Sequence, residues 1–221
     1  MVTTARVGVL SLQGDFARHR DAIEALGVEA RRVTLPRDLE AVAALVIPGG
    51  ESTTLLRLVE ATGLRVPLER FVRERPVMGT CAGVILLGRE AARLPYATLR
   101  ALDVATERNA YGRQIDSFVA ELDVTVVGGR FEGVFIRAPR LARVGPGVEI
   151  IARRPLAGGA PPEIVGVRER NVVGLCFHPE LTADRRLHRW FLRDVAGFPL
   201  SHDPAAVARS PRHRGARVES A

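Results

Sequence analysis

A cysteine in a glycine-rich turn is the feature of this sequence with the clearest chemical meaning. Residues 79–83 read Gly-Thr-Cys-Ala-Gly, between a short apolar segment, 76–79, and the apolar segment 84–87. A strand that turns sharply into a helix through small residues leaves the side chain at the turn accessible, as in a nucleophile elbow. The helix N-terminus behind Cys81 favours its thiolate form. The pattern predicts a nucleophile, and the alternative is an inert core cysteine beside a glycine turn.

A histidine and a glutamate two residues apart supply candidates for the rest of a catalytic triad. Residues 177–180 read Phe-His-Pro-Glu at the end of an apolar segment. A thiolate nucleophile needs a base that also protonates the leaving group, and a carboxylate can fix the tautomer of that base. We therefore predict a triad of Cys81, His178 and Glu180. The other four histidines are interpreted as surface residues on helices or in the tail: His19, His188, His202 and His213.

Acyl transfer also needs hydrogen-bond donors for an oxyanion. Residues 48–51 read Pro-Gly-Gly-Glu directly after the apolar segment 43–47. Gly49 and Gly50 can present backbone N–H groups with no side chain in the way. We predict that the N–H groups of Gly50 and Ala82 bind the oxyanion, although a Gly-Gly pair alone is typical of an ordinary turn.

Strand and helix patterns alternate along most of the chain. Apolar segments predict buried strands, and 3.6-residue periodicity predicts helices, the second of which has Ser52 as its N-cap. Residues 117–127 alternate with period two, which predicts a half-exposed strand in an antiparallel hairpin that turns at 128–129. The predicted strands are 7–12, 43–47, 76–79, 131–136, 163–167 and 172–177; the predicted helices are 15–26, 53–62, a segment through 84–87, and 182–195.

These elements predict one three-layer α/β/α domain with a mixed, mostly parallel sheet. In such sheets, active sites lie at the carboxyl ends of the strands. The three loops with reactive residues, after Ile47, Met78 and Phe177, all follow predicted strands. With 221 residues, the chain is long enough for one sizeable domain. We assign residues 1–200 to it and residues 201–221 to a basic, disordered C-terminal tail.

Composition excludes several other classes. No apolar run reaches the ~18 residues of a membrane span, and the N-terminus lacks signal-peptide anatomy. We expect a cytoplasmic protein in which Cys81 and Cys176 are free thiols. The net charge is +7 with no lysine, and the arginines are scattered. No aromatic residue accompanies the arginines of the tail, which argues against nucleic-acid binding.

Together these motifs resemble the class I, triad-type glutamine amidotransferases, whose fold is flavodoxin-like. Further strings resemble the glutaminase subunit of pyridoxal 5′-phosphate synthase, over about residues 6–197. They are Leu-Gln-Gly at 12–14, Gly-Gly-Glu-Ser-Thr-Thr at 49–54, Arg-Asn-Ala-Tyr-Gly-Arg-Gln at 108–114, Phe-Ile-Arg-Ala-Pro at 135–139 and Phe-His-Pro-Glu-Leu at 177–181. One departure is Val119, where this family leads us to expect an acidic residue.

The resemblance implies hydrolysis of L-glutamine to L-glutamate and ammonia, with no cofactor and no metal. It implies six glutamine-binding residues: Gly49, Gly50, Glu51, Arg108, Ile136 and Arg137. It also implies delivery of ammonia to the pyridoxal 5′-phosphate synthase subunit in a hetero-oligomeric ring assembly for vitamin B6 biosynthesis. In this family the glutaminase is nearly silent until docked, and we hypothesise that the oxyanion loop is misformed in the free chain.

Three alternatives remain open at the level of sequence. One is the glutaminase of another synthase, such as the imidazole glycerol phosphate type, although the string at 108–114 argues against it. A second is a cysteine peptidase or hydrolase of the same architecture, which would leave Arg108 and Arg137 unexplained. The third is a scaffold or nucleic-acid-binding subunit, for which steep salt dependence of DNA binding would be the signature.

Overall fold

Nine strands form one sheet, with parallel pairing in one half and antiparallel pairing in the other. The computed structural model describes residues 6–92, 94–108, 110–111 and 117–200. Five neighbouring strands are parallel, and the remaining four pair antiparallel. In spatial order they are β2 (Ala30–Val33), β1 (Val7–Leu10), β3 (Ala44–Ile47), β4 (Val77–Thr80), β12 (Val172–Leu175), β11 (Glu163–Glu169), β10 (Glu149–Arg154), β7 (Ser117–Val124) and β8 (Gly129–Ile136).

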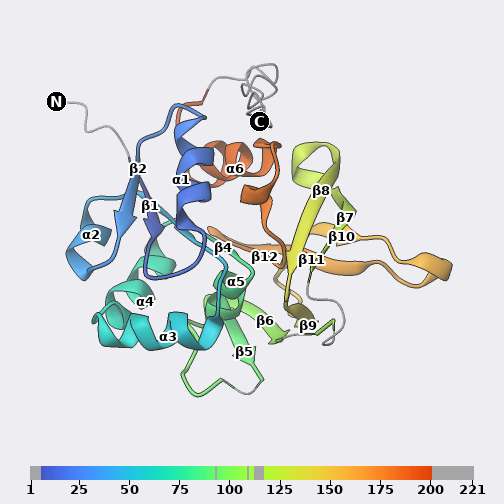
Figure 1. Ribbon diagram of the computed structural model, residues 1–221, viewed down its shortest axis with the longest axis horizontal. Helices are drawn as coiled ribbons and strands as arrows, with labels where there is room; N and C mark the ends of the chain where they lie inside the picture. The colour runs from blue at the N-terminus through green and yellow to red at the C-terminus, as the bar shows by residue number, and fades with distance from the viewer. Residues whose placement is uncertain (1–5, 93, 109, 112–116, 201–221) are drawn as a thin grey trace, which may run out of the picture.

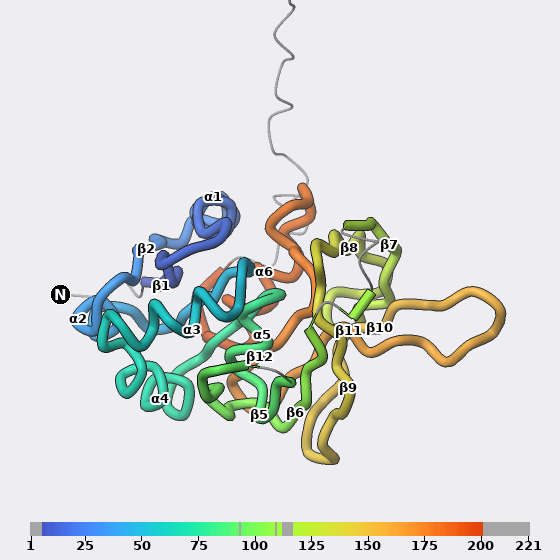
Figure 2. Tube along the Cα trace, turned by 60° about the horizontal axis from the view of Figure 1, so that its bottom comes forward, coloured from blue at the N-terminus to red at the C-terminus, as the bar shows by residue number. Residues whose placement is uncertain are grey.

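Helices cover both faces of the parallel half, which gives the predicted three layers. Figure 1 shows α1 (Phe16–Glu24) and α6 (Arg186–Trp190) on one side of the sheet. On the other side lie α3 (Ser52–Ala61), α4 (Arg65–Glu74) and α5 (Ala82–Leu87), with α2 (Pro36–Glu40) near the β2 edge. The connection between β10 and β11 projects from the body in both Figure 1 and Figure 2.

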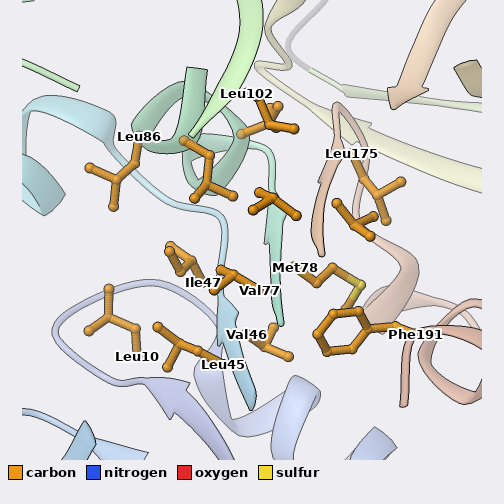
Figure 3. Close-up of a cluster of buried hydrophobic side chains, with 14 of the residues drawn as sticks. Leu10, Leu45, Val46, Ile47, Val77, Met78, Leu86, Leu102, Leu175 and Phe191 are labelled. Atoms are coloured by element: carbon orange, nitrogen blue, oxygen red, sulfur yellow. The ribbon is translucent and has the colours of Figure 1, made fainter. Parts of the chain in front are cut away.

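The core lies around the central parallel strands. Every residue of β1, β3, β4 and β12 is buried, as expected for strands covered on both faces. Val46 and Met78 are register partners on neighbouring strands, and Figure 3 shows Met78 pointing toward Phe191 from the C-terminal helical segment. The strand ends that carry the reactive loops are therefore anchored in the most buried part of the protein.

A small three-stranded sheet, absent from our predictions, supports one side of the site. It contains β5 (Gly88–Ala91), β6 (Leu102–Glu107) and β9 (Arg140–Val144). Because β6 and β9 are antiparallel with Glu107 opposite Arg140, the residue that follows β6 and the segment that precedes β9 leave the sheet at the same end. Those positions hold Arg108 and Arg137.

The structure corrects two predicted element ends. The helix at α3 is capped by Glu51 and not by Ser52, since the Glu51 carboxylate accepts the N–H groups of Thr53 and Thr54 at 3.0 and 2.6 Å. The strand predicted to reach residue 127 ends at Val124, before a 3-10 turn over Thr125–Val127.

The last helix starts later than its apolar periodicity predicted. Pro179–Leu181 is a 3-10 turn, α6 begins at Arg186, and Phe191–Val195 continues as a π-helical turn. The Asp184 carboxylate accepts the Arg186 N–H at 2.9 Å, so its side chain supplies the hydrogen bond that helical backbone would otherwise provide. The helix therefore starts after Asp184.

Some predictions fall on residues that the structure does not describe. The basic tail at 201–221 lies outside the described residues, as do positions 109 and 112–114 of the arginine-containing string. The proposed domain boundary at residue 200 stays a prediction. Across the described segments, no helix combines the length and the apolarity required to cross a membrane.

A close backbone approach fixes α5 against the neighbouring strand. A Cβ atom at Gly83 would collide with the Ile47 carbonyl oxygen and would lie 3.3 Å from the Ile47 Cβ. Glycine at this position therefore lets the first turn of α5, directly after Cys81, rest on the end of β3.

We predict that Gly83→Ala destabilises the protein and displaces the turn at Cys81. Because the collision involves backbone, we expect the free energy of unfolding to fall by about 1–3 kcal/mol, as for overpacked cores. Denaturant unfolding measures this. Gly147→Ala is the matched control, since nothing lies within 4 Å of a Cβ there. Equal stability of the two variants would contradict the packing argument.

Candidate active site

Cys81 occupies a strained backbone position between β4 and α5. Its φ and ψ are 48° and −105°, in a region that residues with a side chain rarely adopt. Its N–H donates to the Leu175 carbonyl at 2.8 Å, which ties the turn to β12. The side chain is buried, with Sγ 3.8 Å from the Ile136 carbonyl oxygen. The sharp turn from strand to helix is the one that the nucleophile-elbow pattern predicts, but Cys81 is only 5% exposed and is less accessible than that pattern led us to expect.

His178 and Glu180 follow the strand next to β4. Leu175 of β12 pairs with Thr80 of β4, so the two chains leave the sheet side by side. The His178 N–H donates to the Val134 carbonyl of β8 at 2.8 Å. Nδ1 of His178 lies 2.7 Å from Oε1 of Glu180, and both side chains are buried. The predicted pairing of histidine with glutamate is thus present in the structure.

The electrostatics of this pair favour a charged imidazole. Burial opposes the charge on His178, but the Cys81 and Glu180 side chains together raise its pKa to about 10. Burial also opposes ionisation of Glu180, but His19 and His178 hold the pKa of that carboxyl far below its usual range. Cys176 is a free thiol, as predicted for both cysteines, and burial raises its pKa well above the usual range, which makes it inert.

The glycine loop after β3 packs directly on the triad. A Cβ at Gly49 would collide with the His178 ring and would lie 3.1 Å from the Cys81 Cβ. The Gln13 side chain accepts the Glu51 N–H at 3.1 Å, which fixes the far end of the loop. A residue with a side chain at position 49 would not fit against His178 and Cys81. Glycine at position 49 therefore allows the backbone N–H groups of the loop to lie close to Cys81. The assignment of Gly50 and Ala82 as oxyanion donors stays a prediction.

A cavity of about 100 Å³ opens beside Cys81. This volume is well below the roughly 300–1,000 Å³ of sites for drug-sized ligands, so it suits a small metabolite better than a peptide. A larger cavity of about 660 Å³ lies beside β5 and β6, but its described lining contains no cysteine or histidine. The small cavity is lined by Gly50, Glu51, Ser52, Cys81, Ile85, Arg108, Ile136, Arg137 and His178.

Both signs of charge meet at the rim of this cavity. Nη2 of Arg108 lies 3.1 Å from Oε1 of Glu51 and 3.1 Å from the Thr53 hydroxyl. Burial opposes ionisation of Glu51, but the N–H groups of Thr53 and Thr54 lower its pKa to about 2. Arg137 is exposed and has a left-handed backbone, with φ of 42°. A carboxylate with two guanidinium groups matches the ammonium and carboxylate of a free amino acid.

Two histidines that we predicted to be on the surface are buried. His19 and His188 are 0% and 1% exposed. Nε2 of His19 lies 3.2 Å from Oε2 of Glu180, directly behind the triad. A signal was present in the sequence: His19 lies three residues after Phe16 and four before Ile23, on the apolar stripe of its helix. The physical reason for the error is that their partners come from distant segments.

Among the described residues, no group of three or more His, Cys, Asp or Glu side chains could hold a metal ion. The site brings together a cysteine, a charged imidazole and a carboxylate around a small cavity, which suits nucleophilic acyl transfer.

Comparisons with known proteins agree with this geometry. A model of the SNO glutamine amidotransferase family matches residues 9–197. The chain belongs to this family. A pyridoxal 5′-phosphate synthase subunit PdxT from Cutibacterium acnes is 48% identical over 194 residues, covering 86% of this chain and 96% of the relative. The subunit of the same name from Thermus thermophilus is 50% identical over 194 residues, covering 86% and 97%.

Solved structures confirm the predicted fold of this glutamine amidotransferase. A crystal structure of a glutamine amidotransferase matches with a TM-score of 0.79 and 45% identity, covering 86% of this chain and 98% of the other. PurLQS from Thermotoga maritima matches with a TM-score of 0.65 and 18% identity, covering 86% and 99%. The second likeness concerns the fold alone.

We predict that Cys81→Ala lowers the pKa of His178 below its value of about 10. The substitution removes an interaction that raises this pKa, whereas burial, which lowers it, remains. An NMR titration of the His178 ring measures the effect. Cys176→Ala is the matched control, since it removes a buried thiol that is not among the main causes of the His178 pKa shift. An unchanged His178 titration in Cys81→Ala would contradict the assigned contact.

Proposed function

We propose that this protein is the glutaminase subunit of a pyridoxal 5′-phosphate synthase, which hydrolyses L-glutamine and passes the ammonia to its synthase partner. The observation that carries the proposal is the small cavity at which Cys81, His178, Glu51, Arg108 and Arg137 meet. Relatives named as PdxT subunits are identical to this chain at 48% and 50% of 194 aligned residues.

The first half of the reaction forms a thioester. The Cys81 thiolate attacks the side-chain amide carbon of glutamine, and the Gly50 and Ala82 N–H groups receive the oxyanion. His178 is charged at neutral pH because its pKa is raised to about 10. The imidazolium donates its proton to the departing nitrogen, the C–N bond breaks, and ammonia leaves. The products of this half are the glutamyl thioester and a neutral imidazole.

The second half reverses the role of His178. Once Cys81 is acylated it carries no charge, so one of the causes that raise the His178 pKa is gone. Neutral His178 then accepts a proton from water, and the hydroxide attacks the thioester carbon. The C–S bond breaks, and the Cys81 thiolate and the His178 imidazolium are restored. The product leaves as the γ-carboxylic acid, which loses its proton to water and becomes glutamate. Glu180 stays ionised throughout and holds the Nδ1 side of the ring.

The rim charges recognise the amino-acid end of glutamine. Glu51 is suited to the α-ammonium, and Arg108 and Arg137 are suited to the α-carboxylate. Ile136 completes the wall of the cavity, with its carbonyl near Sγ, and Gly49 packs on the triad behind the lining residues. These contacts place the side-chain amide, and not the α-carboxylate, next to Cys81.

Transfer to a partner follows from the chemistry of ammonia. Ammonia released into neutral water is mostly protonated and is then no nucleophile. A glutaminase that feeds a synthase therefore works docked to it, and we propose the pyridoxal 5′-phosphate synthase subunit as that partner, in a cytoplasmic hetero-oligomeric ring. The hypothesis that the oxyanion loop completes its geometry on docking belongs to this proposal.

We predict that the synthase subunit strongly stimulates release of glutamate from glutamine by this chain. Cys81→Ala should lower that release on the order of a thousandfold or more, because the nucleophile is gone. A coupled glutamate assay on the purified chain, alone and with the partner, measures both effects. Full activity of the free chain would contradict docking activation and reopen the choice of synthase. No activity in either state would favour a hydrolase or peptidase with another substrate.

We also predict that Arg137→Gln raises the KM for glutamine by on the order of 10- to 100-fold, since a hydrogen bond to a charged group is lost. Steady-state kinetics of the complex measure this. Arg130→Gln is the matched control, because Arg130 is on the same hairpin, pairs with Glu121 and does not line the cavity. Equal KM values for the two variants would contradict a role of Arg137 in binding.

A further inference from the structure

A cluster of polar side chains is buried behind the triad, and the mechanism above does not use it. It contains His19 from α1, Thr80 from β4 and His188 from α6, next to Glu180. The exposed fractions are 0% for His19 and Thr80 and 1% for Glu180 and His188. Polar groups at such depth are costly unless they are paired, so the contacts among them have a structural or chemical purpose.

The carboxylate of Glu180 faces a different imidazole with each oxygen. Oε1 lies 2.7 Å from Nδ1 of His178, and Oε2 lies 3.2 Å from Nε2 of His19. The Thr80 hydroxyl also lies 3.2 Å from Nε2 of His19. Of these two oxygens, the Thr80 hydroxyl is the one aligned for a hydrogen bond with Nε2. No donor among the described residues is aligned for a hydrogen bond to Oε2, so the approach of His19 at 3.2 Å is a close polar contact and not a hydrogen bond.

The rest of the cluster holds the His19 ring in place. Nδ1 of His19 lies 3.1 Å from Nε2 of His188. Because Glu180 is ionised, Nε2 of His19 has to carry a proton to interact favourably with it. His188 stays neutral, since burial and the neighbouring His19 lower its pKa to about 3. Its Nε2 can accept from a charged His19 or donate to a neutral one, so either state keeps the contact.

We propose that His19 is a positioning residue for the triad, which holds Oε2 of Glu180 so that Oε1 stays directed at Nδ1 of His178. Without that contact the buried carboxylate is free to rotate about its last bond. Rotation would lengthen the hydrogen bond that orients His178 toward Cys81. A misplacement on the order of 1 Å is enough to cost about a hundredfold in rate.

Charges around the cluster agree with this assignment. Among the groups that lower the pKa of Glu180, His19 is the largest and His178 follows, against the opposing effect of burial. Arg185, directly before α6, lowers the pKa of His188, and Asp21 and Arg18 of α1 shift the pKa of Arg185 in opposite directions. Among the described residues, Glu180 is the carboxylate that contacts His19, at 3.2 Å.

Two substitutions of His19 separate positioning from packing. Gln in place of His keeps a side-chain N–H near the position of Nε2, whereas His19→Leu keeps an apolar body and loses the donor. We expect His19→Leu to lower kcat for glutamine on the order of 10- to 100-fold with KM nearly unchanged. His19→Gln should recover most of the loss. Arg20→Gln, in the next position of α1 and paired with Glu24, is the matched control.

The kinetic comparison uses the complex with the synthase subunit and therefore rests on the proposed function. An NMR titration of His178 in the same variants does not. We expect the His178 pKa to fall in His19→Leu and to return toward about 10 in His19→Gln, because the Glu180 contact raises it. Thermal unfolding confirms that each variant folds.

Three outcomes would overturn the inference. One is wild-type kcat and wild-type His178 titration in His19→Leu. Another is equal loss in His19→Gln and His19→Leu, which would indicate a packing role. The third is a higher His178 pKa in His19→Leu, which would indicate that His19 acts only as an opposing charge. Failure of the wild-type complex to release glutamate would overturn the proposed function instead and leave the titration result standing.

Discussion

The site depends on one strained backbone conformation, where β4 turns into α5 at Cys81. A residue with a side chain in such a conformation costs on the order of 1–3 kcal/mol, so the surroundings have to impose it. They do so through the hydrogen bond to Leu175, through the flanking strands β3 and β12, and through a wholly buried α5. The apolar middle of the sheet is therefore what holds the nucleophile at the cavity.

Two kinds of electrostatics meet at this cavity. The side chains of His178 and Glu180 are 9% and 0% exposed, so each charge there needs a specific partner. The charged side chains at the rim, to which we assign the binding of glutamine as a proposal, are more accessible, with the Glu51 side chain 43% and the Arg108 side chain 22% exposed. The buried charges of the triad keep a fixed geometry for the chemical step, whereas the accessible charges of Glu51 and Arg108 can exchange water for substrate. The groups for the chemical step and those for binding thus lie at different depths of one small cavity.

The elbow, the triad and the alternating α/β pattern could be predicted because each is a local string with readable chemistry. The burial of His19 and His188 could not be predicted, because their contacts are distant in sequence. His19 and His188 are 169 residues apart, and His19 and Thr80 are 61 residues apart. The small sheet was also missed, because the sequence of β9 mixes arginine with apolar residues and is typical of an exposed loop. Glu51 as a cap was missed because short side chains are the usual choice at that position. In each case tertiary contact decided what local preference left open.

The segment from Gln13 to His19 touches the active site at both of its ends. Gln13 holds the Glu51 N–H at the glycine loop, and His19 contacts the triad carboxylate. One inserted residue would turn the later part of the helix by about 100° and would carry His19 away from Glu180. Substitutions on the solvent side of this helix leave the spacing intact, but a change in its length does not. The number of residues between Gln13 and His19 is thus fixed by two contacts at the active site, and an insertion or a deletion between them would break at least one of these contacts.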